Sequence, residues 1–142
     1  MKSLGQLSLI FTFFLLLFSA CKKDEGTSPS NDPGNIIQSG QWRISLFMED
    51  GNDETSHFSG YVFTFSSDGS AKAEKSGSRV NGSWSKGTDN STPKLNLHFG
   101  NNDPWRELNE DWHILEENSS IIRLEHVSGG NGGIDNLNFT KI

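Results

Sequence analysis

From Gly40 to the end of the chain, apolar and polar side chains alternate in short segments, a pattern typical of β-strands buried on one face. In the first segment Trp42, Ile44, Leu46 and Met48 fall on one face. No segment repeats its apolar positions with the 3.6-residue period of an amphipathic helix. The pattern therefore predicts an all-β domain with eight strands, at residues 42–49, 58–66, 70–75, 79–86, 93–99, 111–116, 120–127 and 134–142.

The residues between the predicted strands indicate how the strands connect. Asp50-Gly51 and Asp68-Gly69 are typical of tight turns between antiparallel neighbours. Residues 70–75 are poor in apolar side chains, so we expect this strand at an exposed edge or rim. A meander of eight short strands closes into a small antiparallel barrel and loses its open edges, and a two-sheet β-sandwich is the alternative.

The start of the chain has a different composition. Lys2 gives a short basic leader, and residues 7–18 are almost entirely apolar. This run is too short to span a bilayer as a mature helix, and it is typical of a secretory signal peptide. Small residues follow the run and lead to Cys21, the only cysteine in the chain.

Leu17-Phe18-Ser19-Ala20-Cys21 resembles the lipobox of bacterial lipoproteins, although that family prefers Leu where this chain has Phe18. The resemblance implies cleavage between Ala20 and Cys21, a diacylglyceryl group on the Cys21 sulfur and an acylated new amino terminus. Two or more acyl chains hold a protein stably at a membrane, so the membrane is an expected partner. An ordinary signal peptide followed by an unmodified cysteine is the alternative.

Residues 22–39 are rich in Pro, Gly, Ser and charged side chains, which predicts a flexible tether. We therefore expect a signal peptide at 1–20, a lipidated Cys21 and tether at 21–39, and a barrel domain at 40–142. Lys22-Lys23-Asp24-Glu25 resembles the signals that send lipoproteins of Bacteroidota to the cell surface, and a solvated charge run is the alternative. The expected location is the outer membrane, with display at the cell surface.

Gly40-Gln41-Trp42 at the start of the first predicted strand is repeated as Gly82-Ser83-Trp84 in the fourth. The first copy resembles the strand A signature of lipocalins, in which the Trp plugs the barrel floor beneath a cation from the end of the chain. The order of the remaining segments is similar to that of the lipocalin-like domains of Bacteroidota lipoproteins. The resemblance implies a lipocalin-like barrel with Gly40, Trp42 and Lys141 at its floor, and Arg123 is the other candidate for the cation. Plain core packing is the alternative role for both tryptophans.

Charge and motif content limit the chemistry. The net charge is -6, which argues against nucleic acid as a partner, and a single cysteine forms no internal disulfide. The four histidines lack the spacing of a zinc motif, and adjacent carboxylates on a strand point to opposite faces. No nucleotide or hydrolase motif is present in the sequence. We expect a non-catalytic protein with no cofactor or metal, and with the lipid on Cys21 as its covalent group.

The loop at residues 100–109 holds the candidate ligand contacts, Trp105 and Arg106. An aromatic ring there stacks on a sugar or guards a barrel mouth, whereas the alternative is a turn that tucks Trp105 and Leu108 over the core. We expect side chains to fill most of so small a barrel. The expected function is the binding of a small hydrophobic ligand or a partner. A surface glycan-binding accessory domain and a protease inhibitor or envelope assembly subunit are the alternatives.

Overall fold

Strands that follow one another in the sequence are neighbours in the sheet. The computed structural model describes residues 36–129 and 132–142, which contain nine strands and two short 3-10 helices. The strands are β1 (Trp42–Glu49), β2 (Asn52–Asp53), β3 (Val62–Phe65), β4 (Ser70–Lys75), β5 (Ser78–Asp89), β6 (Thr92–His98), β7 (Asp111–Glu117), β8 (Ile121–Val127) and β9 (Ile134–Lys141). The 3-10 helices are η1 (Thr55–Phe58) and η2 (Trp105–Leu108).

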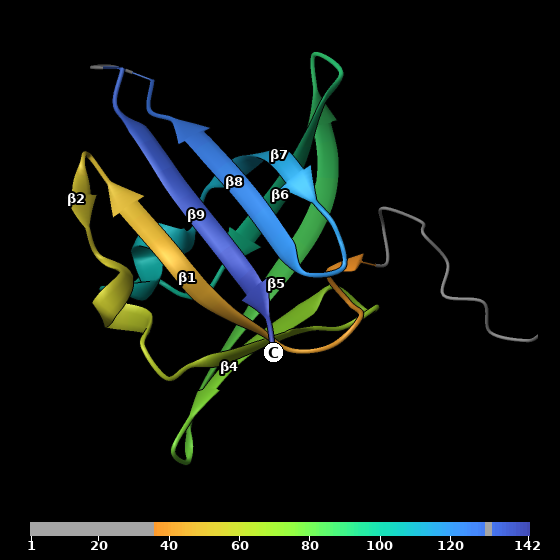
Figure 1. Ribbon diagram of the computed structural model, residues 1–142, viewed down its shortest axis with the longest axis vertical. Helices are drawn as coiled ribbons and strands as arrows, with labels where there is room; N and C mark the ends of the chain where they lie inside the picture. Colours follow the sequence, from red (N-terminus) through yellow and green to blue (C-terminus); the bar gives the residue numbers. More distant parts are fainter. Residues whose placement is uncertain (1–35, 130–131) are drawn as a thin grey trace, which may run out of the picture.

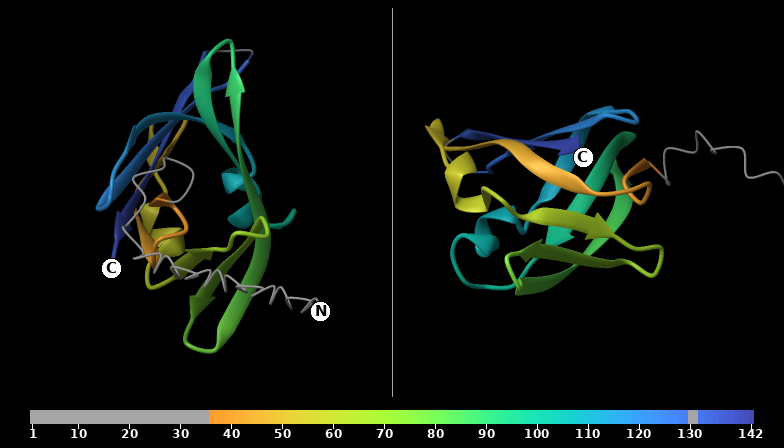
Figure 2. Two further views of the ribbon diagram at one scale, coloured as in Figure 1. Left: turned by 90° about the vertical axis from the view of Figure 1, so that its right-hand side faces the viewer. Right: turned by 60° about the horizontal axis from the view of Figure 1, so that its bottom comes forward.

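The sheet closes on itself as an antiparallel barrel, seen from three sides in Figures 1 and 2. Strands β3 to β9 pair in order, and β1 pairs with both β3 and β9, so that Trp42 lies opposite Lys141 at the closing seam. The short β2 is an additional strand that pairs with the end of β1 across a turn. The all-β meander barrel expected from the sequence is confirmed, and the two-sheet sandwich is not formed.

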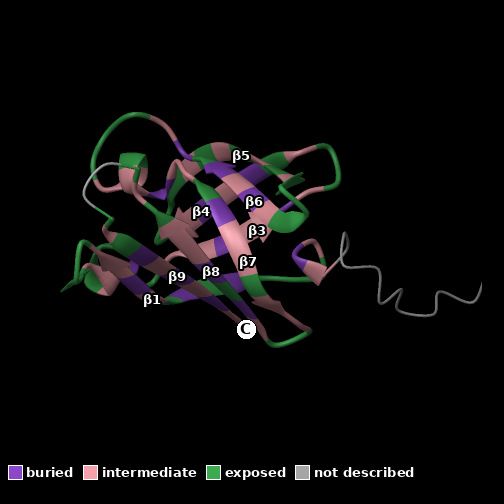
Figure 3. Cartoon of the chain, turned by 90° about the horizontal axis from the view of Figure 1, so that it is seen from above, coloured by how far each residue is buried: buried purple, intermediate pink, exposed green. Residues whose placement is uncertain are grey.

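The interior is packed with the inward side chains of the strands. Figure 3 shows buried positions alternating with exposed ones along the strands. The largest fully buried side chains are Trp42, Trp112, Phe47, Phe58, Phe63, Phe65 and Phe139, and aliphatic residues fill the space among them. Every described strand and the whole described core lie within residues 36–142.

The first strand departs from strict alternation. Its pairing with β9 shifts register between Ile44 and Leu46, which marks a β-bulge. Beyond the bulge Phe47 is buried, whereas Leu46 and Met48 are half-buried. The expectation that Leu46 and Met48 continue the face of Trp42 was wrong, because one extra residue at the bulge turns the rest of the strand over.

Residues 58–66 do not form one strand, contrary to the sequence-based expectation. Phe58 ends η1, and β3 begins only at Val62. Gly60 between them has φ +81°, a left-handed conformation that favours glycine, and the amide of Tyr61 donates to the Phe58 carbonyl at 3.1 Å. A turn therefore occupies the first part of the predicted strand.

Strand β4 lies inside the sheet, between β3 and β5, so its expected place at an exposed edge was wrong. Its inward residues Ala71 and Ala73 are buried directly opposite Phe65 and Phe63. Small side chains fit there because the facing phenylalanines fill the space. The low apolar content of this strand reflects small core residues and a solvated outer face.

The packed domain begins earlier than the predicted boundary at residue 40. Ile37 has no exposed surface, and its carbonyl oxygen accepts a hydrogen bond from Trp42 Nε1 at 2.8 Å. Residues 36–39, assigned to the tether from composition, therefore pack against the barrel. Within the described residues no helix is long and apolar enough to cross a bilayer.

Candidate functional site

The barrel wall opens between β1 and β3. The two strands form one paired position, Trp42 opposite Phe63, and continuing that register would place Arg43 opposite Val62 and then Ile44 opposite Tyr61. That pair does not form, because the Tyr61 amide is already bonded to the Phe58 carbonyl in the turn before β3. From this point the strands separate, and η1 lies at the far end of the opening.

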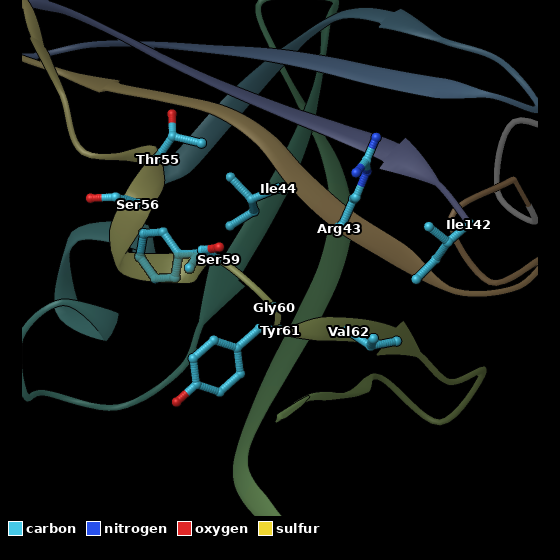
Figure 4. A pocket seen from close by; sticks show the side chains of 10 residues that line it. Arg43, Ile44, Thr55, Ser56, Ser59, Gly60, Tyr61, Val62 and Ile142 are labelled. Carbon is cyan, nitrogen blue, oxygen red and sulfur yellow. The ribbon is translucent and has the colours of Figure 1, made fainter. Parts of the chain in front are cut away.

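A cavity of about 410 Å³ occupies this opening, and we call it the wall pocket. Figure 4 shows side chains from β1, η1, the turn before β3 and β3 itself around it. Its lining residues are Arg43, Ile44, Thr55, Ser56, Phe58, Ser59, Gly60, Tyr61, Val62 and Ile142. The volume falls in the lower part of the range of small-molecule sites in proteins, about 300–1,000 Å³.

The lining combines an apolar surface with a few polar groups. Ile44, Phe58 and Val62 supply apolar side chains, and hydroxyls and one guanidinium lie around them. The Thr55 hydroxyl accepts a hydrogen bond from the Phe47 amide at 2.8 Å, which fixes the start of η1 against β1. Arg43 and Tyr61 are the titratable side chains of the lining. The lining therefore offers one cation, one phenol and several hydroxyls around an apolar surface.

The three residues expected at the barrel floor lie together at the start of β1. Lys141 Nζ lies 5.9 Å from the centroid of the Trp42 ring, which is a cation–π distance. Gly40 has φ +131°, and a Cβ there would lie 2.9 Å from Lys141 Cε, so glycine makes room for the lysine. The other candidate cation, Arg123, is exposed and pairs with Glu116 at 3.1 Å.

Trp105 and Arg106 point to different environments. The Trp105 ring is half-buried and packs against the rings of Phe58, Tyr61, Phe63 and Phe99, with the shortest centroid distance, 4.9 Å, to Tyr61. Arg106 is exposed and pairs with Asp103 at 2.8 Å. Leu108 at the end of the same helix is fully buried. The loop therefore covers the core with Trp105 and Leu108, and the structure does not join Trp105 and Arg106 in one surface.

A second, more open cavity of about 610 Å³ lies beside the β4–β5 hairpin. Its charged groups already have partners within the protein. Arg79 contacts Glu74 at 2.6 Å, and hydrogen bonds from Arg79 and Lys72 lower the pKa of the Glu74 carboxyl. The ammonium of Lys75 donates to the Ser59 carbonyl at 2.6 Å. A ligand would compete with these contacts, so the wall pocket is the stronger candidate.

Carboxylates gather near the end of the barrel that carries η1 and η2. Burial raises the pKa of Glu49, and the charge of Glu107 raises it further. Burial also raises the pKa of Glu107, followed by the charge of Asp103. One Glu107 oxygen is buried without a hydrogen-bond partner among the described residues. These carboxylates line neither cavity, so their raised pKa values reflect burial first and neighbouring like charges second, and they mark no site.

Glu110, Asp111 and His126 are the one group within the described residues whose metal-ligating atoms lie within 4.8 Å of one another. The two carboxylates face different ring nitrogens of His126, at 3.6 and 3.5 Å. Lys94 forms an ion pair with Asp111, and its hydrogen bond lowers the pKa of that carboxyl. A metal ion would have to displace this ammonium, and we assign no metal to the group.

Sequence inspection missed the wall pocket because it depends on where a strand breaks. Ser59-Gly60 inside the predicted strand 58–66 was the available signal, since a Ser-Gly pair often marks a turn. Nothing in the alternation distinguishes Arg43 from any other outward residue of β1. Ala20 and Cys21, the predicted cleavage and lipidation residues, lie outside the described residues.

The fold and the wall pocket define a small closed antiparallel barrel with a lateral opening. No protein-family model matches the chain, and no curated protein matches it significantly. Among solved structures, a DUF4847 family protein from Bacteroides vulgatus ATCC 8482 is 17% identical, with a TM-score of 0.50 over 76% of this chain and 96% of that one. A lipocalin-like protein from Bacteroides uniformis ATCC 8492 is 19% identical, with a TM-score of 0.46 over 75% of this chain and 99% of that one. At these identities the first likeness supports the fold alone.

Proposed function

We propose that this protein is a non-catalytic, lipid-anchored envelope protein whose barrel binds a small, largely apolar ligand in the wall pocket. The observation that carries the binding role is the opening between β1 and β3, where Ile44 and Phe58 are reached through a gap in the wall. Because side chains fill the barrel interior, a ligand can contact apolar side chains only at an opening in the wall. Polar groups around the gap give such a ligand an orientation.

The wall pocket is a better candidate than the Trp105 loop. Binding of a sugar by stacking needs an exposed aromatic face, whereas Trp105 meets Phe58 and Tyr61 edge to face inside the aromatic cluster. The glycan-binding alternative therefore loses its main aromatic platform. An inhibitor or assembly subunit would act through its loops and would not need the wall pocket.

Binding can be tested with N-phenyl-1-naphthylamine, a neutral apolar probe that fluoresces when it leaves water. The chain from Lys22 onward is suitable, because it retains every described strand and the described core. We expect saturable binding of one probe per protein. Val62→Trp, which places a bulky ring in the pocket lining, should weaken binding by about tenfold, equivalent to about 1.4 kcal/mol.

Thr64→Trp is the matched control, because Thr64 lies two positions along on the same face of β3 and outside the pocket lining. It should bind the probe as the unmodified chain does. Equal weakening by both substitutions, or no saturable binding at all, would show that the pocket is not a ligand site.

The anchor is tested separately in the full chain. Cys21→Ala should move the protein from the membrane fraction to the soluble fraction and abolish incorporation of labelled palmitate, because the lipid is proposed to sit on this sulfur. Ser28→Ala in the tether serves as the control and should stay with the membranes. A Cys21→Ala protein that remains membrane-bound would contradict the lipid anchor without affecting the proposal for the barrel.

If the anchor is present, protease treatment of intact cells tests the proposed outer-membrane location and surface display. We expect the barrel to be accessible from outside.

A further inference from the structure

Arg43 differs from the other cations in the part of the chain that the structure describes. Lys72, Arg79, Lys86, Lys94, Arg106 and Arg123 all form ion pairs with carboxylates. Lys75 and Lys141 donate hydrogen bonds and lie over aromatic rings. The side chain of Arg43 has neither an ion pair nor a hydrogen bond to any described residue, and it lines the wall pocket.

Arg43 lies in the barrel wall next to the apolar lining of the pocket. Arg43 points outward from β1, and its neighbour Ile44 faces the core and is reached through the gap. In Figure 4 Arg43 lies at one side of the pocket beside Ile142, with Ile44 next to it on the side of η1 and Val62 across the opening on β3. The pocket therefore has a cationic edge next to an apolar surface.

The lining holds no Asp or Glu side chain, and Arg43 forms no ion pair with the terminal carboxylate of Ile142, which also lines the pocket. The chain as a whole is acidic, with 18 Asp and Glu against 12 Lys and Arg, and most described cations are already paired. A guanidinium offers a planar set of N–H donors that fits a carboxylate, sulfonate or phosphate oxygen pair. An anion that approaches this face finds Arg43 available at the pocket.

We propose that the wall pocket selects apolar ligands that carry one anionic group, with the anion on Arg43 and the apolar body against Ile44, Phe58 and Val62. This inference rests on the proposed binding function and adds the chemical class of the ligand. The charge of Arg43 supplies selectivity, and the apolar surface supplies most of the affinity, because an exposed ion pair contributes little by itself.

Two probes with the same ring systems test the proposal. 8-Anilino-1-naphthalenesulfonate carries a sulfonate, and N-phenyl-1-naphthylamine lacks it. We measure the dissociation constants of both probes for the chain from Lys22 onward and for Arg43→Gln. The unmodified chain should prefer the sulfonate by about fivefold, the size of one exposed ion pair. Arg43→Gln should abolish this preference, by weakening the binding of the sulfonate several times more than the binding of the neutral probe.

Arg123→Gln is the matched control, because Arg123 is an exposed arginine on an outward position of β8 and outside the pocket lining. It should retain the preference for the sulfonate. Raising the salt concentration should reduce the preference of the unmodified chain, since ions screen exposed charges.

The outcomes separate this inference from the proposed function. Binding of the neutral probe with no preference for the sulfonate would leave the pocket as a ligand site and overturn the role of Arg43. A preference that survives in Arg43→Gln would overturn it as well. Failure of both probes to bind would remove the proposed function together with the inference.

Discussion

Replacing Gly82 with alanine is expected to destabilise the barrel by about 3 kcal/mol, because the added methyl group has no space. A Cβ at this position would lie 2.4 Å from the His98 carbonyl oxygen and 2.7 Å from Cδ1 of Phe99. The carbonyl belongs to β6, which pairs with β5 at this point through Ser83 and His98. The Phe99 ring is buried and packs edge-on against Phe63, with centroids 5.6 Å apart.

Thermal unfolding followed by circular dichroism measures this effect. For a domain of this size the midpoint should fall by more than about 10 °C. Gly87→Ala is the matched control on the same strand, because the nearest atom to a Cβ at Gly87 is Asn96 Nδ2 at 3.8 Å. Alanine there should be neutral or stabilise by about 0.5 kcal/mol. Equal midpoints for the two variants would show that β5 does not approach β6 as closely as the structure describes.

Gly82 shows what the Gly-x-Trp repeat contributes in physical terms. In the first copy, Gly40 gives space to Lys141 beside Trp42. In the second copy, Gly82 lets β5 come close to Phe99, and Trp84 packs against Phe65 and donates from Nε1 to the Ser66 carbonyl at 2.9 Å. The same pattern therefore serves the barrel floor in one place and strand packing in the other.

Alternation along the sequence was sufficient to predict most of the wall. A strand with one buried face must repeat every second residue, and β6 follows this rule with Leu95 and Leu97 buried and His98 exposed. The turn after β1 was also predictable from Asp50-Gly51, which adopt positive φ angles of 46° and 82°, although the short strand β2 that follows it was not predicted. These features are local, so the local sequence determines them.

Most of the features that build the wall pocket depend on more than the local pattern of apolar residues. The bulge near Ile44 depends on how β1 pairs with β9. The alternation of apolar and polar residues along β1 does not show where the extra residue of the bulge lies. The gap beside Tyr61 depends on a turn inside a segment whose composition favours a strand. The unpaired state of Arg43 depends on which carboxylates the fold brings near it. The sequence therefore predicted the barrel but not the wall pocket.

The segment before the first strand has the second large expected effect. Ile37→Ala should destabilise the barrel by about 3 kcal/mol, because it removes most of a fully buried side chain and leaves a cavity at the floor. The Ile37 carbonyl also accepts the hydrogen bond from Trp42 Nε1 at 2.8 Å, so a shift of this segment would leave a buried indole N–H without its acceptor. Urea unfolding of the chain from Lys22 onward gives the measurement.

Ile134→Ala is the control, since Ile134 is 51% exposed and its loss should change the free energy of unfolding by less than about 0.5 kcal/mol. A chain that begins at Gly40 should be destabilised at least as much as Ile37→Ala, because it lacks both the side chain and the carbonyl. If Ile37→Ala and the shortened chain instead unfold at the urea concentration of the unmodified protein, Trp42 closes the floor alone. Residues 36–39 would then belong to the predicted tether, as their composition indicates.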